Sequence, residues 1–174
     1  MKKILVLVSI LLLIVSTATS FADTKEAEKA FLFELKKGIP QGKIVSTDDL
    51  YKKWQEVQAG TSEAIIIDIR TEAEFDAGHL KDANNIDSGH AYGIPKKWSD
   101  PESEMWIFCR TQHRAGYFVS LLYKYGYKNV YLVKGGIKEW AGKGYPLYNK
   151  YLGEIKVLQY HKKLEEDFLY RENK

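Results

Sequence analysis

Residues 106–116 read WIFCRTQHRAG, and this stretch decides the predicted fold. The apolar residues before Cys109 are typical of a short strand that is covered on both faces. A helix is predicted from Arg114, five residues after Cys109, which leaves a loop between the strand and the helix. In an open parallel sheet, ligands bind at the carboxyl ends of the strands. The sequence therefore places Cys109 at the ligand-binding edge of an α/β sheet.

Cys109 is the only cysteine of the chain. Its loop closes onto a helix N-terminus, where backbone N–H groups and the helix dipole stabilise an anion. Arg110 and Arg114 lie on either side of this loop and His113 is near, surroundings that favour the nucleophilic thiolate over the thiol. The alternative is a buried cysteine that acts only as a small hydrophobic residue. We interpret Cys109 as a reactive thiol, because its cationic neighbours go beyond what packing requires.

Outward from this stretch, predicted strands and helices alternate along the chain. The strands are predicted at residues 64–69, 83–86, 105–108 and 130–133. The helices are predicted at residues 25–37, from 46 or 47 up to Gly60, at 71–77, at 114–125 and from Gly135-Gly136 onward. Residues 87–103 are interpreted as a surface loop, and the segment from Tyr151, with Leu158, Leu164 and Phe168, as a further helix. This alternation indicates an α/β fold with a parallel sheet covered on both faces.

The N-terminal segment has the pattern of a secretory signal peptide. Lys2 and Lys3 precede an apolar run at 4–15, and small residues follow up to Ala22. The run is shorter than the roughly 20 residues of a spanning helix, although an uncleaved membrane anchor is the alternative. We expect an exported, periplasmic protein that has no membrane contact after cleavage.

The rest of the chain is expected to form one domain with an extension at each end. The predicted parts are a signal peptide (1–22), an N-terminal helical extension (23–42), an α/β domain (43–149) and a C-terminal helical extension (150–174). Loss of Lys2 and Lys3 lowers the net charge from +3 to +1, so the composition gives no indication of a nucleic-acid partner. His90 and His161 have no spacing typical of a metal site, and none is expected.

Three blocks of residues, in order along the chain, resemble one known family. The first block is Asp68-Ile69-Arg70, Glu74-Phe75, Gly78-His79-Leu80, Ala83 and Asn85-Ile86, similar to the pattern D-x-R-x-x-x-E-[FY]-x-x-G-H-[IL]. The second block is the loop from Cys109. The third block is Gly126-Tyr127, Val130, Leu132, Gly135-Gly136, Trp140, Gly144 and Pro146. With these blocks the chain resembles a rhodanese domain from about Ile44 to Leu147.

The resemblance implies a doubly wound domain with a central parallel sheet, and a loop that holds a cysteine persulfide. It identifies Cys109 as the catalytic residue and the next five residues as substrate-binding, namely Arg110, Thr111, Gln112, His113 and Arg114. The expected reaction is a ping-pong sulfur transfer. A small anionic donor such as thiosulfate supplies sulfane sulfur, and a thiol, cyanide or a protein acceptor receives it. No cofactor is expected.

The length of the loop distinguishes sulfurtransferases from the related phosphatases and arsenate reductases. The loop from Cys109 to Arg114 has six residues, as in the sulfur-transferring members. Related phosphatases and arsenate reductases have a loop one residue longer, which fits a tetrahedral oxyanion. Phosphate or arsenate chemistry is therefore the less favoured alternative. A further alternative is a sulfur carrier or interaction module without catalysis.

The sequence also gives expectations for Gln112 in the loop and for Asp68 and Arg70 in the first block. Gln112 stands where such sulfurtransferases often have Gly, so it must adopt a less favoured conformation or belong to a loop with altered dihedrals. Asp68 and Arg70 are expected to support the site. Asp68 would accept hydrogen bonds from the active loop, and Arg70 would pair with Glu74 across the turn.

Overall fold

The structure is a computed structural model that describes residues 23–155 and 157 of the chain. The chain divides into two compact units, residues 1–33 and 34–174. The described part of the first unit lies in helix α2 (Thr24–Lys37), which agrees with the helix predicted there. The second unit holds the rest of the described fold.

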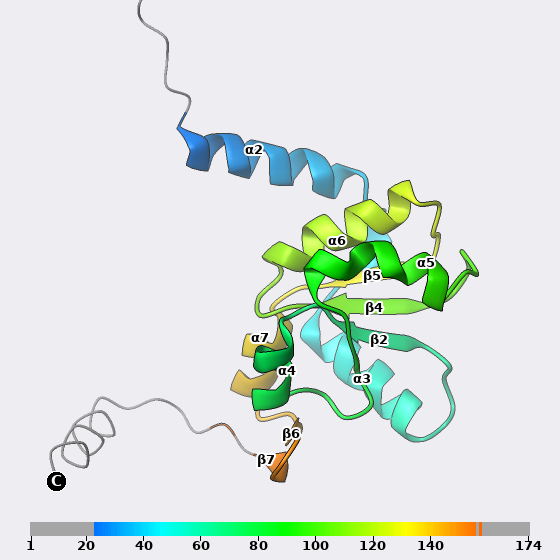
Figure 1. The fold of residues 1–174 in the computed structure, drawn as a ribbon, viewed down its shortest axis with the longest axis vertical. Coiled ribbons are helices and arrows are strands. Elements are labelled where there is room, and N and C mark those ends of the chain that lie inside the picture. The colour runs from blue at the N-terminus through cyan, green and yellow to red at the C-terminus, as the bar shows by residue number, and fades with distance from the viewer. Residues whose placement is uncertain (1–22, 156, 158–174) are drawn as a thin grey trace, which may run out of the picture. The chain divides into compact units, whose positions relative to one another are not determined.

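A parallel sheet forms the centre of the second unit (Figure 1). Its strands are β1 (Ile44–Val45), β2 (Ile65–Asp68), β3 (Asn84–Asn85), β4 (Met105–Phe108) and β5 (Val130–Val133). They lie in the order β1-β5-β4-β2-β3, and every neighbouring pair is parallel. The predicted parallel sheet is thus confirmed, and β4, which leads to Cys109, lies at its middle.

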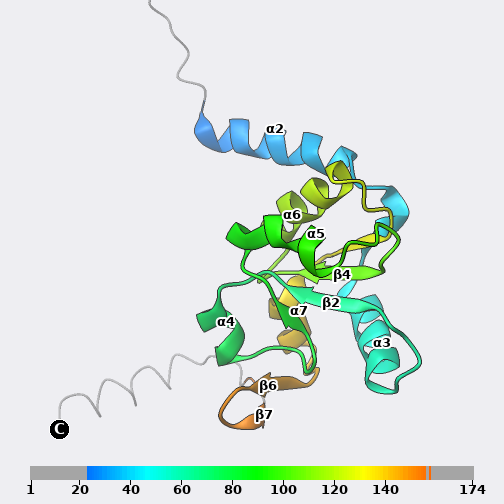
Figure 2. The same cartoon turned by 45° about the vertical axis from the view of Figure 1, so that its right-hand side comes forward.

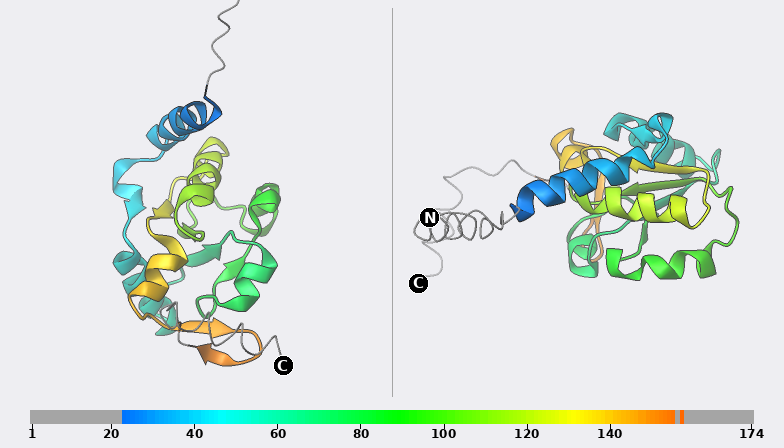
Figure 3. Two further views of the ribbon diagram at one scale, coloured as in Figure 1. Left: turned by 90° about the vertical axis from the view of Figure 1, so that its left-hand side faces the viewer. Right: turned by 90° about the horizontal axis from the view of Figure 1, so that it is seen from above.

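Helices cover both faces of this sheet. They are α3 (Thr47–Gln58), α4 (Glu72–Ala77), α5 (Ile94–Lys97), α6 (His113–Lys124) and α7 (Gly136–Gly142), with short 3₁₀ helices η1 (Gln41–Lys43) and η2 (Ser88–Gly93). Successive strand residues point to opposite faces, so Ile67 and Ile107 enter the core that contains residues of α5 and α6. Ile66 and Trp106 enter the second core, with residues of α3 and α7. The views of Figure 3 show the two helical layers with the sheet between them.

Capping boxes explain where two of the helices begin. The Ser46 hydroxyl accepts from the Asp49 N–H, and the Asp49 carboxylate accepts from the Ser46 N–H in return. Thr71 and Glu74 form the same reciprocal pair before α4. Each box satisfies backbone donors that the first helical turn leaves unpaired. The predicted starts of both helices are confirmed.

The prediction of a loop at residues 87–103 is wrong in part, because η2 and α5 lie within it. The Asp87 side chain accepts from the Gly89 N–H at 2.9 Å and so caps η2. Pro95 lies in the first turn of α5, where it has no hydrogen bond to break. Ile94 is fully buried and holds this segment on the core. Glycine and proline were interpreted as loop signals, whereas here they begin short helices.

The chain beyond Pro146 forms a hairpin that the sequence did not predict. Strand β6 (Leu147–Asn149) pairs antiparallel with β7 (Gly153–Ile155) (Figure 2). A helix predicted from Tyr151 is therefore wrong at its beginning, and the boundary set after residue 149 separates β6 from β7. Tyr148 also exchanges backbone hydrogen bonds with His79, which ties the hairpin to the end of α4.

The predictions for the two ends of the chain lie outside the described residues. These are the signal peptide at 1–22 and the helix with Leu158, Leu164 and Phe168. Within the described part, no helix has the length and apolar character needed to cross a membrane.

Thr47 tests the link between α3 and the sheet. Its side chain is fully buried, and its hydroxyl donates to the carbonyl of Lys134, just before α7, at 2.8 Å. We expect Thr47→Val to lower the free energy of unfolding by about 1 kcal/mol, because the partly buried carbonyl of Lys134 loses its hydroxyl donor. Urea denaturation of the two proteins measures this change.

Thr61→Val is the matched control. The Thr61 hydroxyl also donates to a backbone carbonyl, that of Glu56 at 3.1 Å, but in an exposed place where water can replace it. We expect a change within about 0.5 kcal/mol. Equal losses in the two variants would contradict the role assigned to Thr47.

Candidate active site

The parallel pairing of β2 and β4 brings the two most distinctive sequence blocks together. Asp68 and Phe108 are Cα partners at the carboxyl ends of these strands. The Ile69 N–H continues the pairing by donating to the Phe108 carbonyl at 3.1 Å. The segment after β2 therefore lies beside the loop that begins at Cys109, at the edge where the sequence placed the site.

Helix α7 holds the start of the active loop by its backbone. The N–H groups of Ile137 and Lys138 donate to the carbonyls of Cys109 and Arg110, each at 3.0 Å. This contact depends on Gly136, whose φ is +56°. A Cβ at Gly136 would lie 2.4 Å from the Cys109 carbonyl oxygen, far inside van der Waals contact. The loop carbonyls are thus turned toward α7.

The loop keeps a set of backbone donors without a protein partner. Within residues 23–155 and 157, no protein acceptor pairs with the N–H groups of Arg110, Thr111, Gln112 and Arg114. They lie at the N-terminus of α6, the positive end of its dipole. Such a group of donors stabilises a negative charge next to it.

Gln112 directly precedes α6, with φ −177° and ψ −22°. No residue from 109 to 114 has a positive φ, the region that favours glycine. Gln112 therefore does not adopt the left-handed conformation that favours glycine, and the other expectation, a loop with altered dihedrals, remains a prediction. Its side chain makes no capping hydrogen bond to α6. This loop does not need a glycine at that position.

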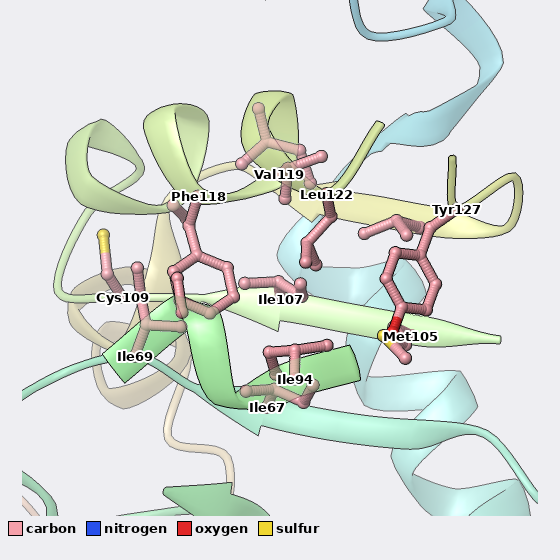
Figure 4. Packing of buried hydrophobic residues seen from close by; sticks show 14 of the residues in the cluster. Ile67, Ile69, Ile94, Met105, Ile107, Cys109, Phe118, Val119, Leu122 and Tyr127 are labelled. Carbon is pink, nitrogen blue, oxygen red and sulfur yellow. The ribbon is translucent and has the colours of Figure 1, made fainter. Parts of the chain in front are cut away.

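The Cys109 side chain is enclosed. Cys109 is 1% exposed and belongs to the core on the α6 side of the sheet. Figure 4 shows its sulfur at the end of β4, near Ile69 and Phe118. Very little of this residue is therefore in contact with solvent. Of the two sequence-based interpretations, burial was the one expected of a cysteine that acts only as a small hydrophobic residue.

Arg114 at the other end of the loop forms an ion pair with Glu74. Its guanidinium donates two hydrogen bonds of 2.7 Å to the two carboxylate oxygens. The Arg114 guanidinium lowers the pKa of Glu74 from its ordinary value of 4.5 to about 2. The pair joins α6 to α4 across the edge of the sheet. The positive charge of Arg114 is therefore largely compensated by protein.

Arg70 forms a buried pair with Asp68 in place of the expected pair with Glu74. Its Nη2 lies 2.6 Å from a carboxylate oxygen of Asp68, and both side chains are buried. Burial raises the pKa of Asp68, and the hydrogen bonds from Arg70 oppose that rise. Arg70 also donates to the carbonyls of Glu74 and Gly78 at 2.8 and 2.7 Å. In the described chain Asp68 makes no hydrogen bond to the Cys109 loop. It instead holds Arg70, which fixes the backbone around α4.

The remaining residues of the predicted site lie at the surface. Arg110, Thr111 and His113 are exposed. In the described part of the chain, the Arg110 guanidinium has no hydrogen bond or ion pair. His79, from the first motif block, stacks on Phe75 and its Nδ1 lies 2.8 Å from the Phe75 carbonyl, a structural role. No group of side chains in the described residues is arranged to hold a metal ion.

Sequence reasoning missed two positions that shape this site. Glu74 was assigned to Arg70, because its true partner Arg114 lies 40 residues away along the chain. Gly136 was predicted only as the start of a helix and as part of the third motif block. The glycine itself could have indicated the contact with the active loop, because glycine is used where two backbones approach closely.

The comparisons with known proteins agree with this architecture. The profile of the rhodanese-like domain matches residues 46–143. An uncharacterised protein of Bacillus subtilis, YqhL, is 33% identical over 89 residues, which are 51% of this chain and 70% of that protein. A sulfurtransferase of Allochromatium vinosum is 32% identical over 89 residues, 51% of this chain and 82% of its own length.

Solved structures are similar in fold. The polysulfide-sulfur transferase homodimer of Wolinella succinogenes has a TM-score of 0.56 at 22% identity, covering 80% of this chain and 94% of that one. The BH2092 protein of Bacillus halodurans has a TM-score of 0.55 at 16% identity, covering 84% and 99%. At these identities the likeness concerns the fold alone.

Gly136→Ala tests the contact between α7 and the active loop. We expect a loss of about 2–4 kcal/mol in the free energy of unfolding, because the new methyl group would overlap the Cys109 carbonyl and the backbone is at positive φ. Thermal or urea unfolding measures it. Gly142→Ala, at the other end of α7 with no atom within 4 Å of the added methyl, is the control and should cost nothing or stabilise the helix. A tolerated Gly136→Ala would contradict the proposed close contact.

The ion pair of Glu74 predicts a pH-dependent stability. Because folding lowers the Glu74 pKa, its contribution is present above pH 4.5 and is lost as the pH falls toward 2. Glu74→Gln should be less stable at pH 7 by up to about 1 kcal/mol, a value suited to a pair that water reaches. The difference from the unsubstituted protein should shrink between pH 4.5 and 2.

Glu72→Gln, on the same short helix, is the control for this measurement. In the described residues its carboxylate forms no ion pair. A stability difference for Glu74→Gln that stays constant down to pH 2 would show that the pair does not stabilise the fold in the way described.

Proposed function

The chain belongs to the rhodanese-like family, and from this premise we propose that it transfers sulfane sulfur through a persulfide on Cys109. The family and the sulfurtransferase among its relatives support an enzyme of the sulfurtransferase type. The donor in this proposal is a small anion such as thiosulfate. The acceptor is a thiol or cyanide, and a protein thiol is included in that class.

One observation carries the proposal. The only cysteine of the chain directly follows the central strand β4, and after it come backbone N–H groups that no protein acceptor satisfies in the described structure. A persulfide is an anion at neutral pH, and its outer sulfur would extend the side chain of Cys109 toward the helix end. Donors fixed in advance stabilise such a charge without reorganisation. The same donors would attract the oxygens of an incoming sulfonate.

The reaction divides into two balanced substitutions at sulfur. The Cys109 thiolate attacks the outer sulfur of thiosulfate, the sulfur–sulfur bond of the donor breaks, and sulfite leaves with the electron pair. The acceptor then attacks the outer sulfur of the persulfide, and Cys109 leaves as a thiolate. Both steps are nucleophilic displacements, in which the covalent intermediate divides one transfer into two.

The two arginines of the loop have different roles in this proposal. Arg110 is exposed and without a partner among the described residues, so its charge is available to an anionic donor. Arg114 is held by Glu74, so it mainly positions the start of α6. Thr111 and Gln112 contribute backbone N–H groups. Donor binding thus depends more on Arg110 than the sequence alone suggested.

The enclosed thiol favours a second candidate function, a sulfur carrier. A persulfide on a residue that is 1% exposed is shielded from small reductants and can be loaded by a protein partner that opens the loop. In an exported protein this shielding would protect the persulfide from reaction before it meets its acceptor. The proposal therefore includes export of the protein and a protein thiol as the acceptor. A carrier predicts one transfer for each loading event, whereas the enzyme predicts repeated turnover.

Steady-state formation of thiocyanate from thiosulfate and cyanide tests the enzyme. We expect parallel double-reciprocal plots, the pattern of a ping-pong mechanism, and no turnover by Cys109→Ser. Arg110→Gln should raise the KM for thiosulfate by about fivefold, because an exposed ionic contact is worth about 1 kcal/mol. Lys96→Gln, an exposed lysine on α5, is the control and should change nothing. Full turnover by Cys109→Ser would rule out the persulfide, and an unchanged KM for Arg110→Gln would exclude its role.

A further inference from the structure

A cavity of about 860 Å³ opens beside the active loop. Helix α4, helix α7 and the hairpin β6–β7 contribute its walls, and Figure 2 shows these elements grouped on one side of the sheet. Its apolar wall is formed by Ile137, Ala141, Leu147, Ile155 and Val157. The volume is in the range of small-molecule sites, whose walls are mostly apolar with a few polar groups. The transfer described above uses none of this apolar surface.

The cavity reaches the active loop at Arg110. Arg110, the second residue of the loop, lines the cavity, and so does Glu74, which holds Arg114 at the end of the loop. Ile137 and Lys138 also line it, and their N–H groups bind the carbonyls of Cys109 and Arg110. A ligand that fills the cavity therefore ends at the loop.

The charges around this cavity favour an anion. Arg110 and Lys138 are both exposed, and neither forms a hydrogen bond or ion pair through its side chain in the described residues. The other two charged lining residues are already compensated, Arg70 by Asp68 and Glu74 by Arg114. Two available cations next to an apolar wall match a ligand with one anionic group and an apolar body.

We propose that this cavity binds the sulfur acceptor, an organic thiol that carries a carboxylate and an apolar body. The inference rests on the proposed transfer through Cys109, and it adds the class of the acceptor. The apolar body packs against Ala141 and Leu147, and the carboxylate lies against Lys138 and Arg110. The thiol is directed toward Arg110 and the start of the active loop, where the outer sulfur of the persulfide would meet it.

The chemistry of this step needs no further reactant. The acceptor thiolate attacks the outer sulfur of the Cys109 persulfide, forming one sulfur–sulfur bond while the bond to Cys109 breaks. The electron pair returns to Cys109 as a thiolate, and the acceptor leaves as an organic persulfide. Sulfane sulfur keeps its oxidation state, so no oxidant or reductant is consumed.

Equilibrium binding to the Cys109→Ser protein tests the cavity apart from the reaction. The probe is 4-(methylthio)phenylacetate, the unreactive thioether of the acceptor 4-mercaptophenylacetate, measured by calorimetry or ligand-observed NMR. We expect saturable binding that Lys138→Gln weakens about fivefold, the effect of losing one exposed ionic contact. Ala141→Leu should weaken binding further, because the larger side chain occupies the cavity.

Two controls make the result specific. Lys134→Gln removes an exposed lysine that does not line the cavity and should leave the affinity unchanged. The cationic analogue 4-(methylthio)benzylamine should bind at least fivefold more weakly than the acid, because Arg110 and Lys138 would repel it. No binding of the acid, or equal affinities in the unsubstituted, Lys138→Gln and Ala141→Leu backgrounds, would overturn the proposal.

Sulfur transfer from the loaded protein separates this inference from the proposed function. With Cys109 present and persulfidated, 4-mercaptophenylacetate should accept sulfur with a higher kcat/KM than the neutral thiol 2-mercaptoethanol, and Lys138→Gln should reduce that preference. Specific binding of the acid without any transfer would support the cavity and contradict the reaction. Transfer to both thiols at equal kcat/KM would support the reaction and contradict the acceptor site.

Discussion

The active site depends on the contact between the loop backbone and helix α7. Two N–H groups at the start of α7 bind the carbonyls of Cys109 and Arg110, and this approach is possible because Gly136 has no side chain. With these carbonyls bound to α7, the N–H groups of Thr111, Gln112 and Arg114 lie at the N-terminus of α6 without a protein acceptor in the described chain. The arrangement that could stabilise a persulfide therefore follows from a packing constraint between two helices and one strand.

A second constraint sets the charge of the loop. The Glu74 carboxylate caps α4 through Thr71 and also binds Arg114 with two hydrogen bonds. One carboxylate thus fixes the end of the loop and compensates one of its two arginines. Arg110 is left to meet an anion, together with Lys138 on the neighbouring cavity wall. The loop therefore contains two arginines, but the charge of only one of them, Arg110, is not compensated by a carboxylate in the described residues.

The sequence predicted the parts of this fold that depend on local pattern. The apolar runs of β2 and β4 and the capping residues Ser46 and Thr71 indicated their elements directly, because each signal lies within a few residues. The hairpin β6–β7 was not predicted, because its strands are three residues long and part of their pairing is with distant residues such as His79. The partner of Glu74 and the burial of Cys109 also depend on distant contacts. Such contacts leave no periodic trace in a single sequence.

The central claim is that Cys109 carries sulfur, and intact mass spectrometry of the protein tests it most directly. After incubation with thiosulfate, the account predicts a mass gain equal to one sulfur atom, located on the peptide that contains Cys109. Addition of cyanide should then restore the original mass and release thiocyanate. A protein whose mass stays unchanged with thiosulfate, with organic thiosulfonates and with a persulfide donor would contradict the account, because the loop would then bind no sulfur at all.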